Sequence, residues 1–206
     1  MKYPRLIINE TKFKNNVKVA IDICKKNNID VLAVTKGFCG NRRMVELYSE
    51  CGIKYFGDSR LENFDVYSDI EGHKQLLRIP SISEIQDVVK KCDSSLNGDL
   101  NVIQKISEYC LNQNLKPHKI VLMVDLGDRR EGVLPEETFL YTVDQIINLK
   151  GVELIGLGCN FGCYGARIPS DEAMQIFVDL KHKIEQKYNI KLSHMSGGNS
   201  LSLHLV

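Results

Sequence analysis

The sequence has almost no excess of charge of either sign and no long apolar run. Lysine and arginine total 27 and aspartate and glutamate total 26, so the net charge is +1 at neutral pH. Such a balance provides no strong field for nucleic acid or an acidic membrane surface. No run approaches the roughly 20 apolar residues of a membrane span, and the first residues lack the apolar stretch of a signal peptide. We therefore expect a cytoplasmic protein that binds neither nucleic acid nor membranes.

Cysteine pairs with the spacing of a zinc or redox motif are also missing. The seven cysteines are scattered, and none forms a Cys-x-x-Cys pair. This spacing is poor for disulfides and for zinc. Cys24, Cys51 and Cys110 fall on apolar helical stripes and are expected to be buried. Cys159 and Cys163 flank a glycine-bearing loop, but no third or fourth ligand is evident, so we predict no metal site.

Apolar runs alternate with helical patterns along the whole chain. Helical spacing is clear after Thr11, which we expect to cap a helix, and after Ser170. The apolar runs predict eight strands, at residues 6–8, 31–35, 55–57, 75–79, 95–97, 119–126, 152–158 and 190–195. Alternating strands and helices indicate repeated β-α units with parallel strands, and eight units make a (β/α)8 TIM barrel of the α/β class. An open doubly wound sheet is the alternative.

No linker, low-complexity tract or charge block divides the chain, so residues 1–206 are expected to form one domain. The length is slightly short for a complete barrel. Residues 201–206 are typical of the first turn of a helix, with neither a stop signal nor a polar tail. We expect the barrel to be incomplete at its C-terminus and the chain to be cut from something longer.

Lys36 ends the apolar run at residues 31–35 and therefore lies at the C-terminal lip of a predicted strand. Active sites of parallel barrels form at this end of the strands. A lysine that is partly desolvated there has a lowered pKa and can act as a nucleophile that forms a Schiff base. The alternative is an amine that pairs with a nearby carboxylate such as Asp58 or Asp125.

Other polar residues follow the remaining predicted strands. They are Asp58, Arg60, Arg78, Asn97, Asp125, Arg129, Arg130, Asn160 and the loop Ser196-Gly-Gly-Asn-Ser200. The loop can present several backbone N–H groups next to a helix N-terminus, which is a typical phosphate site. An imine-forming lysine with a phosphate site fits pyridoxal 5'-phosphate or the sugar-phosphate substrate of an aldolase.

Seven short stretches together resemble the N-terminal barrel of the alanine/ornithine racemase family, which are fold-type III pyridoxal-phosphate enzymes. The stretches are Tyr3-Pro-Arg-Leu6, Val34-Thr-Lys-Gly-Phe-Cys-Gly40, Asp58-Ser-Arg-Leu-Glu-Asn63, Leu77-Arg-Ile-Pro80, Met123-Val-Asp-Leu-Gly-Asp-Arg-Arg-Glu-Gly132, Cys163-Tyr-Gly165 and Ser196-Gly-Gly-Asn-Ser200. They span the chain and keep their order. The resemblance implies a barrel domain that binds pyridoxal 5'-phosphate.

The resemblance also implies roles for individual residues. The implied cofactor-binding residues are Lys36, Arg130, Asn160, Ser196, Gly197, Gly198 and Asn199. Lys36 would carry the Schiff base and act as the catalytic base on one face of the α-carbon of an amino acid. Arg130 would lie near the cofactor's phenolic oxygen or the substrate carboxylate. Tyr164, from its place in a loop near the barrel mouth, is expected to be a packing or substrate-contact residue. Asn160 stands where alanine racemases have a ring-stacking histidine, and Gly40 stands where they have a phosphate-binding tyrosine.

The implied activity is interconversion of L- and D-amino acids such as alanine or ornithine through an α-carbanion. Racemisation needs a base on each face of the α-carbon. In this family the second base comes from a C-terminal β-domain across a homodimer interface, and we expect that domain to be absent from residues 1–206. The chain alone is therefore expected to racemise little. The alternative is a single-domain pyridoxal-phosphate carrier, because Phe56-Gly-Asp-Ser-Arg60 resembles a stretch of those homeostasis proteins.

Overall fold

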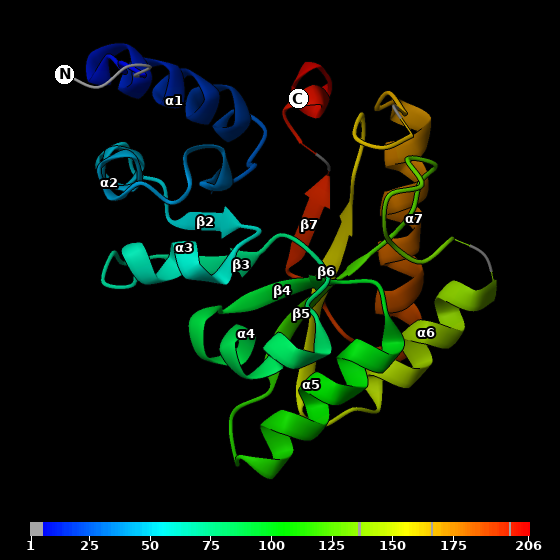
Figure 1. Ribbon diagram of the computed structural model, residues 1–206. Coiled ribbons are helices and arrows are strands. Elements are labelled where there is room, and N and C mark those ends of the chain that lie inside the picture. The colour runs from blue at the N-terminus through cyan, green and yellow to red at the C-terminus, as the bar shows by residue number, and fades with distance from the viewer. Residues whose placement is uncertain (1–5, 136, 166, 198) are drawn as a thin grey trace.

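The computed structural model describes residues 6–135, 137–165, 167–197 and 199–206 as one curved parallel sheet with helices around it (Figure 1). Its seven strands follow one another in sequence order, and every neighbouring pair is parallel. They are β1 (Leu32–Val34), β2 (Tyr55–Asp58), β3 (His73–Leu76), β4 (Ser94–Asn97), β5 (His118–Met123), β6 (Val152–Cys159) and β7 (His194–Gly197).

Helices connect the strands and cover the outer surface of the sheet. The α-helices are α1 (Glu10–Lys25), α2 (Arg42–Glu50), α3 (Leu61–Val66), α4 (Ile85–Lys91), α5 (Leu100–Asn112), α6 (Glu137–Ile147) and α7 (Asp171–Tyr188). Short 3-10 helices are η1 (Lys36–Phe38), η2 (Ile82–Glu84) and η3 (Ser200–Leu205). The curved sheet brings η3 to the same side of the molecule as α1 in Figure 1.

The observed topology confirms the predicted TIM-barrel class of parallel β-α units, here as an incomplete barrel. A doubly wound sheet would reverse its strand order at a switch point, whereas the order here runs from β1 to β7 without reversal. The predicted strand at residues 6–8 is wrong: Leu6 and Ile7 are 84% and 75% exposed and belong to no strand. The prediction depended on only three apolar residues, at positions 6–8, and no neighbouring strand in the described ranges buries them.

Helix caps explain where several helices begin. Asn9, Asn41, Asp99 and Ser170 each accept a hydrogen bond from a backbone N–H in the first turn of α1, α2, α5 and α7. Such caps satisfy N–H groups that have no partner inside the helix. The cap predicted at Thr11 is wrong, because Asn9 caps α1 and Thr11 lies inside it. Asparagine is as good a cap as threonine, and it comes two residues earlier.

Two large hydrophobic clusters hold the helices to the sheet. The first joins β5 and β6 to α5, α6 and α7 through buried residues such as Ile106, Leu122 and Phe177. The second joins β1, β2 and β3 to α2, α3 and α4 through residues such as Phe56 and Phe64. Cys24 and Cys110 are buried as expected, whereas Cys51 is only half-buried.

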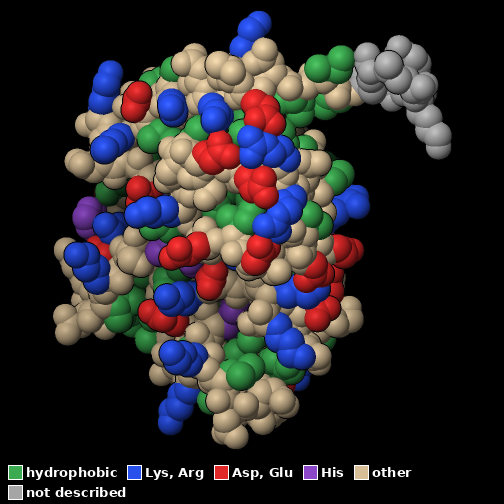
Figure 2. Space-filling view, turned by 90° about the vertical axis from the view of Figure 1, so that its left-hand side faces the viewer, with side chains coloured by type: hydrophobic (Ala, Val, Ile, Leu, Met, Phe, Trp, Pro, Cys, Tyr) green, Lys and Arg blue, Asp and Glu red, His purple; other side chains and the backbone are tan. Residues whose placement is uncertain are grey.

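Exposed ion pairs connect α1 to α2. Arg43 contacts Glu10 at 2.6 Å and Glu50 at 2.8 Å, and Lys14 contacts Glu50 at 3.1 Å. Figure 2, which shows the left-hand side of Figure 1, has basic and acidic side chains interspersed over this face. Each exposed pair contributes little to stability, about 0 to 1 kcal/mol. None of the helices in the described ranges is long and apolar enough to cross a membrane.

Candidate functional site

Lys36 lies two residues beyond β1, in the 3-10 turn Lys36–Phe38, and its side chain is exposed. The partial desolvation of Lys36 predicted from its apolar strand is therefore wrong. Val34, in the same apolar run, is 41% exposed, because β1 forms one edge of the described sheet. Within the described ranges the Lys36 amine makes no ion pair or hydrogen bond, so the alternative of pairing with Asp58 or Asp125 is not observed.

Asp58 and three polar neighbours form a buried network that includes Thr35, the residue before Lys36. We call Thr35, Asp58, Asn63 and Tyr67 the Asp58 network; Thr35, Asp58 and Tyr67 are fully buried and Asn63 is 8% exposed. The Thr35 hydroxyl donates to Asp58 Oδ2 at 2.6 Å and lies 3.0 Å from the Tyr67 hydroxyl. Asp58 Oδ1 accepts from Asn63 Nδ2 at 3.0 Å and from the Arg60 N–H at 2.9 Å.

Burial raises the pKa of Tyr67 to about 12, so its hydroxyl stays protonated and can donate to Thr35. The hydrogen-bond directions in the Asp58 network are then consistent. Tyr67 donates to Thr35, Thr35 donates to Asp58, and the other Asp58 oxygen accepts two N–H groups. The Tyr67 and Thr35 hydroxyls and both Asp58 carboxylate oxygens thus each have a hydrogen-bond partner, as is usual for buried polar groups.

The chain returns to Thr35 immediately after Lys36. The Gly40 N–H donates to the Thr35 carbonyl at 3.1 Å, which closes a loop over residues 36–39 that we call the Lys36 loop. Gly40 has φ +64°, and a Cβ there would lie 2.8 Å from Asn63 Cβ and 3.0 Å from Asn63 O. A side chain therefore does not fit at Gly40 without a shift of Asn63.

Arg130, Glu131 and Asn160 meet where β5 and β6 end. Asn160 Nδ2 donates to Glu131 Oε1 at 2.7 Å, and Arg130 Nε lies 3.4 Å from the same oxygen. Arg130 Nη1 lies 2.7 Å from the sulfur of Cys163. The structure therefore brings two predicted residues, Arg130 and Asn160, into one cluster through Glu131. Glu131 was not singled out by the sequence analysis, although it lies within the matched stretch at residues 123–132.

Asp128 joins the loop after β5 to the loop after β6. It is 2% exposed, and its carboxylate accepts from the backbone N–H groups of Cys163 and Tyr164 at 3.2 Å and of Arg167 at 3.3 Å. The Asp128 carbonyl accepts from the Gly165 N–H at 2.7 Å. Tyr164 is thereby held by its backbone while its side chain remains 81% exposed.

The loop after β7 contains the predicted phosphate site. Ser196 and Gly197 end β7, and Asn199 caps η3 by accepting from the Leu201 N–H at 2.9 Å. Asn199 Nδ2 also donates to the Phe161 carbonyl at 2.6 Å, which ties this loop to the one after β6. Gly198 lies outside the described residues, as do residues 3–5 of the first matched stretch.

Three other candidates from the sequence have structural partners. Arg78 contacts Glu84 at 2.7 Å and donates to the Ser59 carbonyl. Asn97 is fully buried and donates to Ser95, so it does not face solvent at the strand end. The Cys159 thiol donates to the Ser196 carbonyl at 3.6 Å, and burial raises the pKa of this thiol to about 12. Among the described side chains, no group of three or more His, Cys, Asp or Glu is arranged to hold a metal ion.

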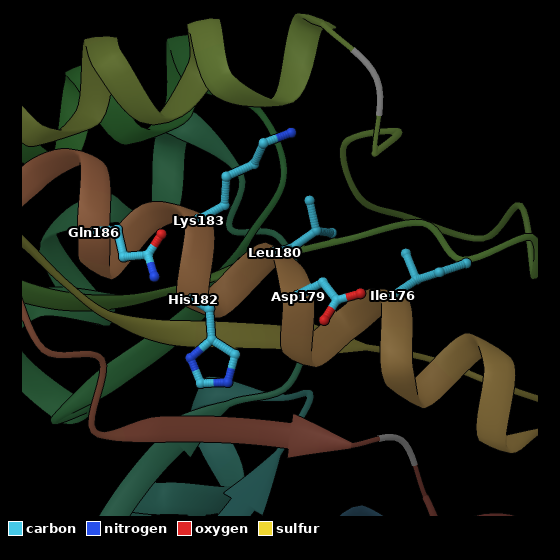
Figure 3. A pocket seen from close by; sticks show the side chains of 6 residues that line it. All are labelled: Ile176, Asp179, Leu180, His182, Lys183 and Gln186. Atoms are coloured by element: carbon cyan, nitrogen blue, oxygen red, sulfur yellow. The ribbon is translucent and has the colours of Figure 1, made fainter.

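A surface pocket of about 360 Å³ lies apart from these strand ends. Figure 3 shows its lining side chains, all from α7: Ile176, Asp179, Leu180, His182, Lys183 and Gln186. None of the residues predicted from the sequence lines it. The candidate site is therefore the edge of the sheet where the strands end, and not this pocket.

Comparisons with known proteins agree with the motifs. The ornithine racemase of Acetoanaerobium sticklandii is 34% identical over 204 residues, and the lysine racemase of Thermotoga maritima is 36% identical over 207 residues. Both alignments cover 99% of this chain, which spans 58% and 57% of the length of these two relatives. The alanine racemase of Clostridium difficile 630 has the same fold, with a TM-score of 0.74 at 16% identity, over 92% of this chain and 52% of that one.

The match to a family model extends over almost the entire chain. Residues 8–205 match the model described as the N-terminal domain of alanine racemase. This match and the two relatives above 30% identity confirm the resemblance inferred from the seven stretches. The chain belongs to the alanine racemase N-terminal domain family.

Proposed function

We propose that residues 1–206 form the cofactor-binding barrel domain of a pyridoxal-phosphate-dependent amino-acid racemase, an isomerase. The observation that carries the proposal is the exposed, unpaired amine of Lys36 at a strand end of a chain in this family. The named activities of the two relatives, ornithine racemase and lysine racemase, support an amino acid as the substrate. Because those relatives are named as racemases, the carrier alternative is not favoured.

The residues at the strand ends fit pyridoxal 5'-phosphate. Lys36 offers an amine for its aldehyde. The space beside Gly197 is open, since a Cβ there would meet only Met174 Sδ, at 3.9 Å. In η3, the Ser202 hydroxyl is buried and has no hydrogen-bond partner in the described part of the chain. Buried hydroxyls usually have a partner, so this one is available to bond a polar group of a ligand beside the loop. We propose Ser196, Gly197, Gly198 and Asn199 as the phosphate-binding residues, with Asn160 beside the ring.

The bound cofactor supplies an electron sink that makes the α-proton of the amino acid acidic. Lys36 Nζ is the group of this chain that would take up and return this proton on one face of the α-carbon. Arg130 provides a cation for the substrate carboxylate or the cofactor's phenolic oxygen. Glu131 fixes the Arg130 side chain from one side and Cys163 from the other. Tyr164 contacts the substrate with its exposed ring.

We propose that the second base comes from outside residues 1–206, in an assembly such as a homodimer. We also propose a cytoplasmic location. All seven cysteines are free thiols in the structure, which suits a reducing compartment.

Proton exchange in deuterium oxide tests the proposed role of Lys36. A single base on one face predicts that the chain with pyridoxal 5'-phosphate incorporates deuterium at the α-carbon of only one enantiomer of alanine, ornithine or lysine, while producing little of the other enantiomer. Lys36→Ala should abolish the incorporation, and the exposed control Lys54→Ala should retain it. Incorporation by Lys36→Ala at the wild-type rate, or its absence in wild type for both enantiomers of all three amino acids, would contradict the proposal.

A further inference from the structure

The Asp58 network contacts both ends of the Lys36 loop. On the entry side, Asp58 Oδ2 accepts from the hydroxyl of Thr35, the residue before Lys36. On the exit side, Asp58 Oδ1 accepts from Asn63 Nδ2, and Gly40 packs against Asn63 so closely that a Cβ would not fit. One buried carboxylate thus bonds both to Thr35, which precedes the loop, and to Asn63, against which Gly40 packs at the end of the loop.

Backbone hydrogen bonds within residues 35–40 also stabilise the conformation of the loop. The Phe38 and Gly40 N–H groups donate to the Thr35 carbonyl at 3.3 and 3.1 Å, and the Cys39 N–H donates to the Lys36 carbonyl at 3.2 Å. Cys39 has φ +53°, a conformation that costs about 1 to 2 kcal/mol for a residue with a side chain. The loop therefore keeps its shape because its surroundings impose it.

We propose that Asp58 is a positioning residue that fixes the Lys36 amine for reaction by holding Thr35 and Asn63 together. The proposal rests on the function proposed above, in which Lys36 is the reactive amine. Lys36 itself is exposed and unpaired in the described structure, so the side chain has no anchor of its own. The backbone then sets the point from which the side chain starts, and a displacement of about 1 Å costs about a hundredfold in rate in well-positioned sites.

The members of the Asp58 network allow positioning to be separated from stability. Thr35→Val removes the entry link and Asn63→Leu removes the exit link, and both keep the approximate shape of the side chain. Tyr67→Phe removes a buried hydrogen bond from the same network but leaves both links to Asp58 intact. Thr35→Ser keeps the hydroxyl and serves as the rescue variant.

The measurement is the rate at which pyridoxal 5'-phosphate and borohydride modify Lys36, followed by mass spectrometry of the Lys36 peptide under conditions where each variant is folded. Thr35→Val and Asn63→Leu should slow modification about tenfold or more. Thr35→Ser and Tyr67→Phe should stay near the wild-type rate, although Tyr67→Phe unfolds at lower urea concentration. Wild-type rates in Thr35→Val, or equal slowing in Tyr67→Phe and Thr35→Val, would overturn the proposal.

Hydrogen exchange of the Phe38 and Gly40 amides tests the hold on the loop without any cofactor. Both amides should exchange faster in Thr35→Val and Asn63→Leu than in Tyr67→Phe. If wild-type Lys36 is not modified at all, the proposed function fails, while this exchange pattern still decides whether Asp58 holds the loop. Equal exchange in all variants would overturn the positioning role even if Lys36 is modified in wild type.

Discussion

The strand ends on the two sides of the sheet are held in different ways. At β1, the Lys36 loop stands on the Asp58 network, whose polar groups are buried and mutually satisfied. At β5, β6 and β7, the loops are held mainly by one another, through Asp128, through Asn160 with Glu131, and through Asn199 with the Phe161 carbonyl. Several of these contacts are partly exposed, and the Tyr164 side chain is almost free.

This difference matches the different tasks we assign to the two sides. A reacting amine needs one fixed position, and a buried hydrogen-bonded network provides it because any displacement leaves polar groups without partners. Residues that contact a substrate can adjust, and loops joined by partly exposed contacts permit this. The β1 side is therefore expected to be rigid and sensitive to substitution, and the β5–β7 side more tolerant.

Substitution at Gly40 should have the largest effect. Gly40→Ala places a Cβ 2.8 Å from Asn63 Cβ at φ +64°, so the strain and the clash together should lower the free energy of unfolding by about 3 kcal/mol. Gly37→Ala, three residues earlier, is the matched control, because a Cβ there meets nothing within 4 Å. Urea unfolding measures both. Equal effects of the two substitutions would show that the Lys36 loop is not held against Asn63.

Asp128 is the buried carboxylate of the β5–β7 side, and its loss should have the next largest effect. Asp128→Asn replaces an acceptor of three backbone N–H groups with an amide, which should cost about 2 kcal/mol. Hydrogen exchange should accelerate at Cys163, Tyr164 and Arg167 while the Phe38 and Gly40 amides remain protected. Acceleration on both sides would contradict the independence of the two regions.

Loss of the ion pair between Arg78 and Glu84 should lower the free energy of unfolding by a smaller amount. This pair supports the chain next to Asp58, because Arg78 donates to the Ser59 carbonyl. The hydrogen bond from Arg78 lowers the pKa of Glu84 to about 2, from 4.5. The stabilisation is thus present above pH 4.5 and is lost as the pH falls toward 2. The loss should be on the order of 1 kcal/mol, since both side chains are partly exposed.

Urea unfolding of wild type and Glu84→Gln between pH 2 and pH 6 measures this contribution. The difference in unfolding free energy between the two proteins should be largest at pH 6 and should vanish near pH 2. A difference in unfolding free energy that grows as the pH falls would show that ionised Glu84 does not stabilise the protein through Arg78.

The smallest effect is expected at Cys163, which is exposed and contacts Arg130. Cys163→Ser should change the free energy of unfolding by less than about 0.5 kcal/mol, as for most surface substitutions. If the β5–β7 side were as rigid as the β1 side, this substitution would be clearly destabilising. Thermal unfolding at neutral pH distinguishes the two cases.

The fold could be predicted largely from its apolar runs. The run at residues 119–126 predicted β5, and the run at residues 152–158 predicted β6, because long buried strands leave a continuous apolar signal. The predicted strand at residues 6–8 failed, since a short apolar run does not show whether another strand pairs with it. The last strand begins at His194 and not at residue 190, because polar and apolar residues alternate too briefly there.

The site could be predicted only in part. Lys36, Arg130 and Asn160 were predicted because strand ends and the family resemblance point to them, and the structure brings Arg130 and Asn160 together through Glu131. The Asp58 network was not foreseen, because its members are separated by up to 32 positions in sequence and their pairing depends on tertiary packing. Apolar patterns predict which residues are buried, but they do not predict which polar side chains meet inside the protein. Asp128 was missed for the same reason.

Peptide mapping would identify the lysine that borohydride fixes to pyridoxal 5'-phosphate in the wild-type chain and in Lys36→Ala. We expect one modified peptide, containing Lys36, in wild type and none in the variant. Modification of another lysine, or equal modification of both proteins, would refute the proposal that the Lys36 amine is the reactive group of this domain.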